Sequence, residues 1–105
     1  MKKGIVNPKR NDCIWYHSTP KERVESILKS GLKINSEPTW QSKPEPWIYV
    51  STIPFFELPD YVTFEVDLSQ LEWEKCGWAF DGYEQLRVFE DIPVEWLKRQ
   101  YKPFS

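Results

Sequence analysis

The stretch Trp15-Tyr16-His17-Ser18-Thr19 carries the only histidine of the chain to the place where an expected strand meets an expected helix. Residues 12–16 are rich in side chains that fit a pleated sheet, and they predict a short strand. The following residues, Thr19-Pro20-Lys21-Glu22, have the pattern of a capping box with proline at the first helical position. We therefore expect His17 and the backbone amide of Ser18 to lie at the amino end of a helix, where a ligand can bind.

A single histidine at the end of a strand is also a common structural hydrogen-bonding residue. On this motif alone, both the functional and the structural interpretation of His17 stay open.

The length of the chain limits it to one domain. It has 105 residues, of which 40% are hydrophobic and 16% aromatic, and this supports one core but not two. We therefore expect a single domain over residues 1–105. Residues 1–11 precede the first predicted strand and can be flexible. Residues 35–46 contain three prolines and no periodic apolar pattern, so they predict a long loop.

Charge and cysteine content narrow the class of protein. The net charge of −2 argues against a protein whose affinity comes from neutralising phosphates. Cys13, Cys76 and one histidine are too few for a structural metal site, so we expect no metal. No apolar run approaches membrane-spanning length, and the N-terminus lacks the apolar core of a signal peptide. We expect a cytoplasmic monomer with reduced thiols and no membrane partner.

The remaining pattern predicts an α+β domain with one main helix and a mostly antiparallel sheet. The helix covers residues 20–30, with an apolar stripe of Val24, Ile27 and Leu28 and with Gly31 as a left-handed cap. Residues 69–83 read as irregular and residues 92–97 as a last turn or short helix before a charged tail. The predicted strands after the helix are 47–52, 61–68 and 84–89.

Three residues now stand in order along the chain: His17, then Tyr49 within Ile-Tyr-Val-Ser-Thr, then Glu84 at the start of a later strand. Together they resemble the His-Tyr-Glu triad of the ADP-ribosyltransferase fold, which PARP-like and diphtheria-toxin-like enzymes share with small bacterial and phage members. The resemblance covers residues 13–97. It includes the opening Tyr-His-Ser-Thr, the helix ending Ile-Leu-Lys-Ser-Gly-Leu and the closing Arg-Val-Phe-(x)2-Ile-Pro.

The resemblance implies an NAD-dependent ADP-ribosyltransferase, a glycosyltransferase that uses NAD as its substrate. His17 would hold the adenosine ribose, Tyr49 would stack on the nicotinamide, and Glu84 would stabilise the cation that forms as nicotinamide leaves. These three are the expected catalytic residues. The acceptor would be a macromolecule of a host or a competitor, as for a toxin or phage effector; a protein is favoured, and a nucleic acid stays open. The expected NAD-binding residues are His17, Ser18, Thr19, Tyr49 and Ser51.

Each assignment has an alternative. Ser18 stands where the family often has glycine, which could crowd the carboxamide pocket. Tyr49 could be an ordinary strand aromatic and Glu84 a plain surface acid. A different strand register would put Glu65, Asp67 or Asp81 in the place of Glu84. The expected partner-binding aromatic residues, which could instead belong to the core, are Trp78, Phe80, Tyr83 and Trp40.

Three rival functions follow from the same residues. An RNA 2′-phosphotransferase uses this fold and NAD but recognises phosphate through several arginines. This rival ranks low, because the net charge is negative, a glutamate stands in the reactive place, and the chain has only Arg10, Arg23, Arg87 and Arg99. A non-catalytic partner-binding or inhibitor module could also be built on the fold. Cysteine catalysis by Cys76 with His17 would need a thiolate beside the imidazole, and the spacing gives no sign of one.

Overall fold

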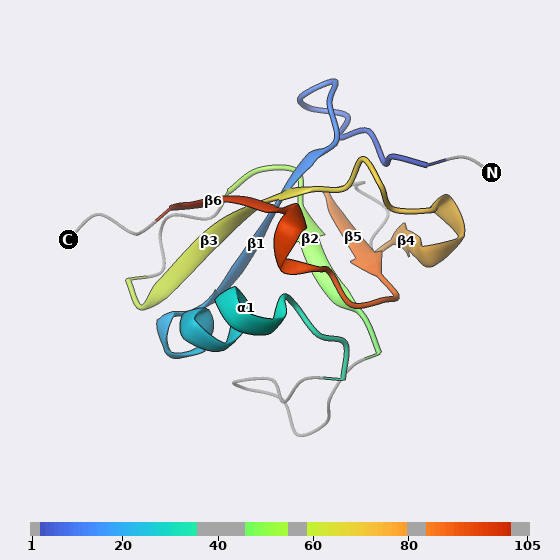
Figure 1. The fold of residues 1–105 in the computed structure, drawn as a ribbon. Coiled ribbons are helices and arrows are strands. Elements are labelled where there is room, and N and C mark those ends of the chain that lie inside the picture. The colour runs from blue at the N-terminus through green and yellow to red at the C-terminus, as the bar shows by residue number, and fades with distance from the viewer. Residues whose placement is uncertain (1–2, 36–45, 55–58, 80–83, 102–105) are drawn as a thin grey trace.

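The computed structural model describes residues 3–35, 46–54, 59–79 and 84–101. Within those residues the chain forms one six-stranded sheet in the order β4-β5-β2-β1-β3-β6, and every neighbouring pair is antiparallel (Figure 1). The strands are β1 Ile14–Pro20, β2 Ile48–Ser51, β3 Tyr61–Asp67, β4 Cys76–Trp78, β5 Gln85–Val88 and β6 Leu97–Tyr101. The helical elements are η1 Lys21–Arg23, α1 Val24–Ser30, η2 Trp73–Lys75 and η3 Val94–Trp96. This confirms the predicted α+β class.

The sheet divides into two halves at the centre. β1 pairs with β3 over its whole length, from Ile14 opposite Asp67 to Pro20 opposite Tyr61. On its other side β1 pairs with β2 at a single position in the described residues, where Tyr16 lies opposite Ser51. The halves β4-β5-β2 and β1-β3-β6 are therefore joined at one residue pair, and the two strands part beyond it.

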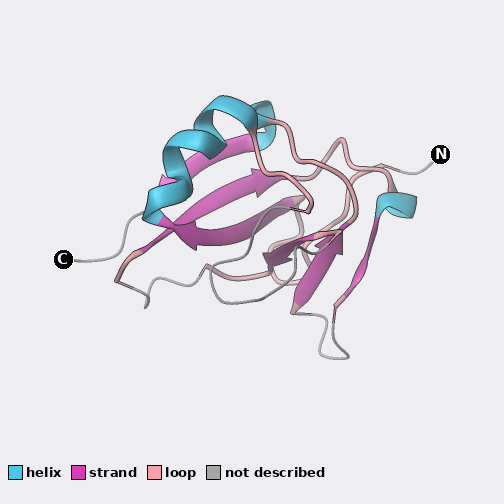
Figure 2. Cartoon of the chain, turned by 90° about the horizontal axis from the view of Figure 1, so that it is seen from below, coloured by secondary structure: helices cyan, strands magenta, loops and turns pink. Residues whose placement is uncertain are grey.

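One face of the sheet is apolar and is covered by α1, which lies across that face in Figures 1 and 2. Residues directly opposite one another in an antiparallel pair point to the same face. The alternation in β3 therefore directs its apolar side chains to the helix side, as predicted. The buried apolar core consists of Trp15, Ile27, Leu32, Ile48, Val50, Val62, Phe64, Val66, Leu68, Leu71, Leu86, Val88 and Ile92.

The end of α1 is the one predicted from the sequence. Gly31 follows the helix with φ 78°, and its N–H donates to the Ile27 carbonyl at 2.7 Å. A Cβ at Gly31 would lie 2.3 Å from the Ile92 carbonyl oxygen, so glycine is required both for conformation and for space. The apolar stripe is narrower than predicted, because Ile27 is buried whereas Leu28 is 47% exposed.

The predicted start of the helix is wrong. β1 continues through His17 to Pro20, and Thr19 is a buried strand residue rather than a helix cap. Neither η1 nor α1 has a side-chain cap, and the Lys21 N–H instead donates to the Asp60 carbonyl at 2.9 Å. The capping box does not form because β3 supplies a backbone hydrogen-bonding partner along the whole of β1 and keeps Thr19 in the strand.

Two strands were not predicted. β4 lies in the stretch that we read as irregular, and β6 lies in the expected charged tail. β4 is only three residues long and β6 is mostly exposed, so neither shows apolar alternation.

Residues 3–11, which precede the first strand, attach to the sheet and to the segment after β3. Gly4 N–H donates to the Leu71 carbonyl, and the Trp15 indole donates to the Ile5 carbonyl at 2.8 Å.

Candidate functional site

The three residues of the expected triad come from three adjacent strands. His17 lies in β1, Tyr49 in β2, and Glu84 immediately before β5, and these strands are neighbours in the sheet order. The fold therefore gathers residues that are 67 positions apart in the chain, from 17 to 84, on the two sides of the sheet division.

The imidazole of His17 lies at the place where β1 and β2 part. Its Nδ1 is 2.7 Å from the backbone carbonyl oxygen of Tyr49. Because a carbonyl oxygen can only accept, Nδ1 carries the proton and Nε2 of the neutral ring is left as an acceptor. Burial lowers the pKa of His17, and the bond to Tyr49 opposes this shift without cancelling it. His17 is thus a neutral, oriented acceptor at neutral pH.

The side chain of Tyr49 projects from the face of the sheet opposite to the face that carries the His17 side chain. Tyr49 lies across from Arg87, while its neighbour Val50 belongs to the core. His17 lies across from Phe64, a core residue on the helix side. The Tyr49 ring packs edge-on against Trp47, with 6.2 Å between ring centroids. The structure therefore brings His17 to the backbone of Tyr49 rather than to its ring.

Glu84 is held by two different contacts. Its backbone carbonyl accepts from the Thr52 N–H at 3.0 Å, which continues the pairing of β2 with β5 by one residue. Its carboxylate forms an ion pair with Lys9 at 2.8 Å, and both side chains are about half exposed, at 51% and 48%. The carboxylate is thus accessible, and its partner in the structure is a lysine of the N-terminal loop.

The other expected NAD-binding residues have mixed surroundings. The Ser18 hydroxyl lies 2.8 Å from that of Thr63, so it is engaged on the face away from the helix. Thr19 and Ser51 are buried, with 3% and 7% exposure. Ser51 is the residue of β2 that pairs with β1, opposite Tyr16. This pairing, and not an exposed side chain, places Ser51 near His17.

Sequence reasoning missed Asn7, which organises this end of the sheet. Asn7 is fully buried, and its amide nitrogen donates to the carbonyls of Ile14 and Thr52 at 2.7 and 3.0 Å. Its side-chain oxygen accepts from the Lys9 N–H at 2.9 Å, which closes an Asx turn and places Lys9 next to Glu84. The Asn7-Pro8 pair is a turn signal that could have indicated this.

The Thr52 hydroxyl is a second feature that the sequence did not reveal. Thr52 is 1% exposed, and its hydroxyl has no hydrogen-bond partner among the described residues. Its backbone bonds to both Asn7 and Glu84, so this polar group lies inside the site.

Among the expected partner-binding aromatics, Trp78 ends β4 and is 41% exposed. The centroid of its ring lies 5.8 Å from that of the buried Trp15. Trp78 therefore contacts the core with part of its side chain and leaves another part accessible. Phe80, Tyr83 and Trp40 lie outside the described residues.

The cysteine thiols and the potential metal ligands give little support for cysteine catalysis or for a metal site in the described residues. Cys13 and Cys76 are free. Burial, and then Glu74, raise the pKa of Cys76, which opposes the thiolate that cysteine catalysis would need. The parts of the chain that the structure describes hold no cluster of three or more potential metal ligands. In those same parts, no helix has the length and apolar character needed to cross a membrane.

Comparison of the chain with protein-family models and with curated proteins finds no match.

Proposed function

We propose that this chain is an NAD-dependent ADP-ribosyltransferase that transfers ADP-ribose to a macromolecular acceptor. The observation that carries the proposal is the hydrogen bond of His17 to the Tyr49 carbonyl where the sheet divides, with Glu84 immediately before β5, the strand that pairs with β2. We propose further that it acts in the cytoplasm as a monomer, with reduced thiols and without a metal.

His17 is suited to bind a ribose. With Nδ1 held by Tyr49, the free lone pair on Nε2 can accept a hydrogen bond from a ribose hydroxyl. A lowered pKa keeps this lone pair available at neutral pH. The Nε2 acceptor is held in position because Nδ1 of the same ring bonds to the Tyr49 backbone, so no mobile side chain is needed to orient it.

Glu84 is suited to stabilise positive charge. As the bond between the nicotinamide nitrogen and ribose C1′ breaks, its electron pair leaves with nicotinamide and C1′ becomes cationic. An ionised carboxylate beside C1′ would favour this state, and the acceptor would then form a bond to C1′ and lose a proton. Lys9 must release the Glu84 carboxylate for this to occur, and such an exposed pair is held only weakly.

Tyr49 fits its expected role less directly. Its ring would have to turn from Trp47 toward the division of the sheet in order to stack on nicotinamide. We therefore assign the firm positioning role to the Tyr49 backbone and keep ring stacking as a proposal.

The test is to measure nicotinamide release from NAD by the wild type, by Glu84→Gln and by the control Glu95→Gln. Glu95 is exposed and lies in η3, outside the strands that carry the expected triad. We expect Glu84→Gln to lower kcat by about 10²-fold or more with NAD binding unchanged, because the charge acts in the transition state. Glu95→Gln should behave as wild type.

Thermal unfolding with and without NAD separates the alternatives. A ligand that binds the folded state raises the melting temperature. Stabilisation by NAD without nicotinamide release would indicate a non-catalytic binding module. If NAD neither stabilises the protein nor is cleaved by it, the proposal is wrong.

A further inference from the structure

The face of the sheet opposite α1 has a composition unlike that of the core. We call it the outer face and define it by cross-strand register, because opposed residues share a face. Tyr49 lies opposite Arg87, Tyr16 lies opposite both Ser51 and Glu65, and Glu65 lies opposite Arg99. The outer-face residues used below are Trp47, Tyr49, Arg87, Tyr16, Glu65, Arg99 and Tyr101, with Arg10 reaching in from the N-terminal loop.

Arginine and aromatic side chains pair three times on this face. The guanidinium carbon of Arg87 lies 5.0 Å from the centroid of Trp47, and that of Arg99 lies 4.8 Å from the centroid of Tyr101. Arg10 lies 5.7 Å from the centroid of Tyr16. The pairs follow one another across the sheet from β5 to β6 and use three of the four arginines of the chain.

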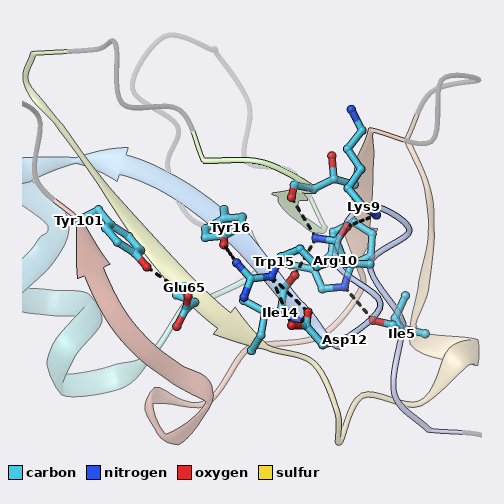
Figure 3. A network of polar contacts seen from close by, with 11 residues as sticks. Ile5, Lys9, Arg10, Asp12, Ile14, Trp15, Tyr16, Glu65 and Tyr101 are labelled. Atoms are coloured by element: carbon cyan, nitrogen blue, oxygen red, sulfur yellow. Dashed lines mark hydrogen bonds and ion pairs between the residues drawn. The ribbon is translucent and has the colours of Figure 1, made fainter.

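The centre of the outer face is linked by direct contacts. Figure 3 shows Arg10 reaching to the hydroxyl of Tyr16, to which it donates a hydrogen bond, and Tyr101 directed toward Glu65. The Tyr101 hydroxyl donates to Glu65 at 3.2 Å, and the rings of Tyr16 and Tyr101 are 6.4 Å apart. Tyr16 is 5% exposed and supports the surface, whereas Tyr101 is only partly buried and can offer part of its ring.

Among the described residues, two nitrogen donors on this face have no acceptor. The Nε of Arg87 and the indole Nε1 of Trp47 are enclosed, and neither has a hydrogen-bond partner among the described residues. Arg87 uses its Nη2 to donate to the Ala79 carbonyl at 3.4 Å. Unsatisfied enclosed donors are rare, so this end of the outer face holds hydrogen-bonding capacity that the described residues do not use.

The net charge of the outer face distinguishes between double-stranded and single-stranded nucleic acid as its ligand. Asp12, Glu65 and Asp67, which lies opposite Ile14 on the same face, balance the three arginines, so the face has no net charge on a chain of net charge −2. A neutral face cannot hold a duplex by its phosphates alone. Stacking of unpaired bases on aromatic rings supplies affinity that needs little net charge.

We propose that the outer face binds single-stranded nucleic acid. Unpaired bases stack on the partly exposed rings of Trp47, Tyr49 and Tyr101, while Arg10, Arg87 and Arg99 contact phosphates or base edges. Binding itself does not depend on the proposed enzymatic activity. Only the further step, that this strand is the acceptor of ADP-ribose, rests on the proposed function.

The test is fluorescence anisotropy of a labelled single strand of RNA or DNA, without NAD, over a range of salt concentrations. Arg99→Gln and Tyr101→Leu change a side chain on β6, and Arg23→Gln in η1 is the control with the same loss of charge. We expect Tyr101→Leu to weaken binding by about 5-fold or more. Arg99→Gln should lower the slope of log K against log salt by about 0.7, and Arg23→Gln should not. A thermal melt of each variant checks that it is folded.

Several results would overturn the proposal. These are no binding of either single strand at low salt, equal binding of a duplex, equal binding of polyglutamate, or an unchanged affinity in folded Tyr101→Leu. Glu84→Gln, which blocks the proposed chemistry, should bind the strand as wild type does. Loss of enzymatic activity and loss of strand binding are therefore distinguishable.

Discussion

The Nδ1 atom of His17 lies 2.7 Å from the carbonyl oxygen of Tyr49, across the place where β1 and β2 part. In a continuous sheet, a backbone N–H of β1 would occupy this position. The imidazole takes the place of that N–H, so the same hydrogen bond orients His17 and fills the opening between β1 and β2. We expect His17→Ala to weaken NAD binding, which calorimetry can measure, whereas an unchanged affinity would return His17 to a structural role.

The same contact predicts a pH dependence. Burial lowers the pKa of His17 below its ordinary value of 6.5, so the unfolded chain binds more protons than the folded protein between the two values. The stability contributed by neutral His17 is complete above about pH 6.5 and is lost as the pH falls toward the folded pKa. Since the chain has one histidine, its imidazole resonances in an NMR titration report this directly. A midpoint at or above 6.5 would contradict the prediction.

Asn7→Ala should reduce the free energy of unfolding by about 2 kcal/mol or more. The change leaves the carbonyls of Ile14 and Thr52 without the amide that now bonds both of them inside the protein. Urea unfolding followed by tryptophan fluorescence would measure it. A loss below about 0.5 kcal/mol would mean that water replaces the amide at this position.

Gly31→Ala and Gly77→Ala form a matched pair. At Gly31 a Cβ would meet the Ile92 carbonyl at 2.3 Å in a backbone with φ 78°, and we expect a loss of more than about 2 kcal/mol. At Gly77 the nearest atoms belong to Phe89 at 3.6 Å, which is ordinary contact, so the change should stay within about 1 kcal/mol. Thermal unfolding of both variants would show whether the difference has this sign.

Lys9→Met should change the free energy of unfolding by less than about 1 kcal/mol, because the ion pair with Glu84 is half exposed and screened by solvent. The pair thus positions a loop over the carboxylate without contributing much stability. Chemical denaturation at low and high salt would measure the effect. A loss above about 2 kcal/mol would show that the loop depends on this contact.

Local patterns were sufficient for several elements. The alternation of Val62, Phe64 and Val66 predicted β3 and its buried face, since side chains on a strand repeat every two residues. Gly31 predicted the end of α1, since few other residues adopt a positive φ.

Other features depended on contacts between distant segments. Thr19 has every local sign of a helix cap, yet β3 holds it in a strand by pairing along the full length of β1. β4 is recognisable only beside β5, and β6 only beside β3, because three or five residues without apolar alternation carry no periodic signal.

The sequence by itself determined the α+β class, the end of the helix, the alternation of β3 and the candidate residues, because each of these depends on side-chain type or short-range spacing. Only the tertiary structure decided that the sheet divides beside His17, that Asn7 brings Lys9 to Glu84, and that three arginine–aromatic pairs share one face. These depend on strand register and on burial. Both arise from the packing of segments that are far apart in the chain, so no local pattern encodes them.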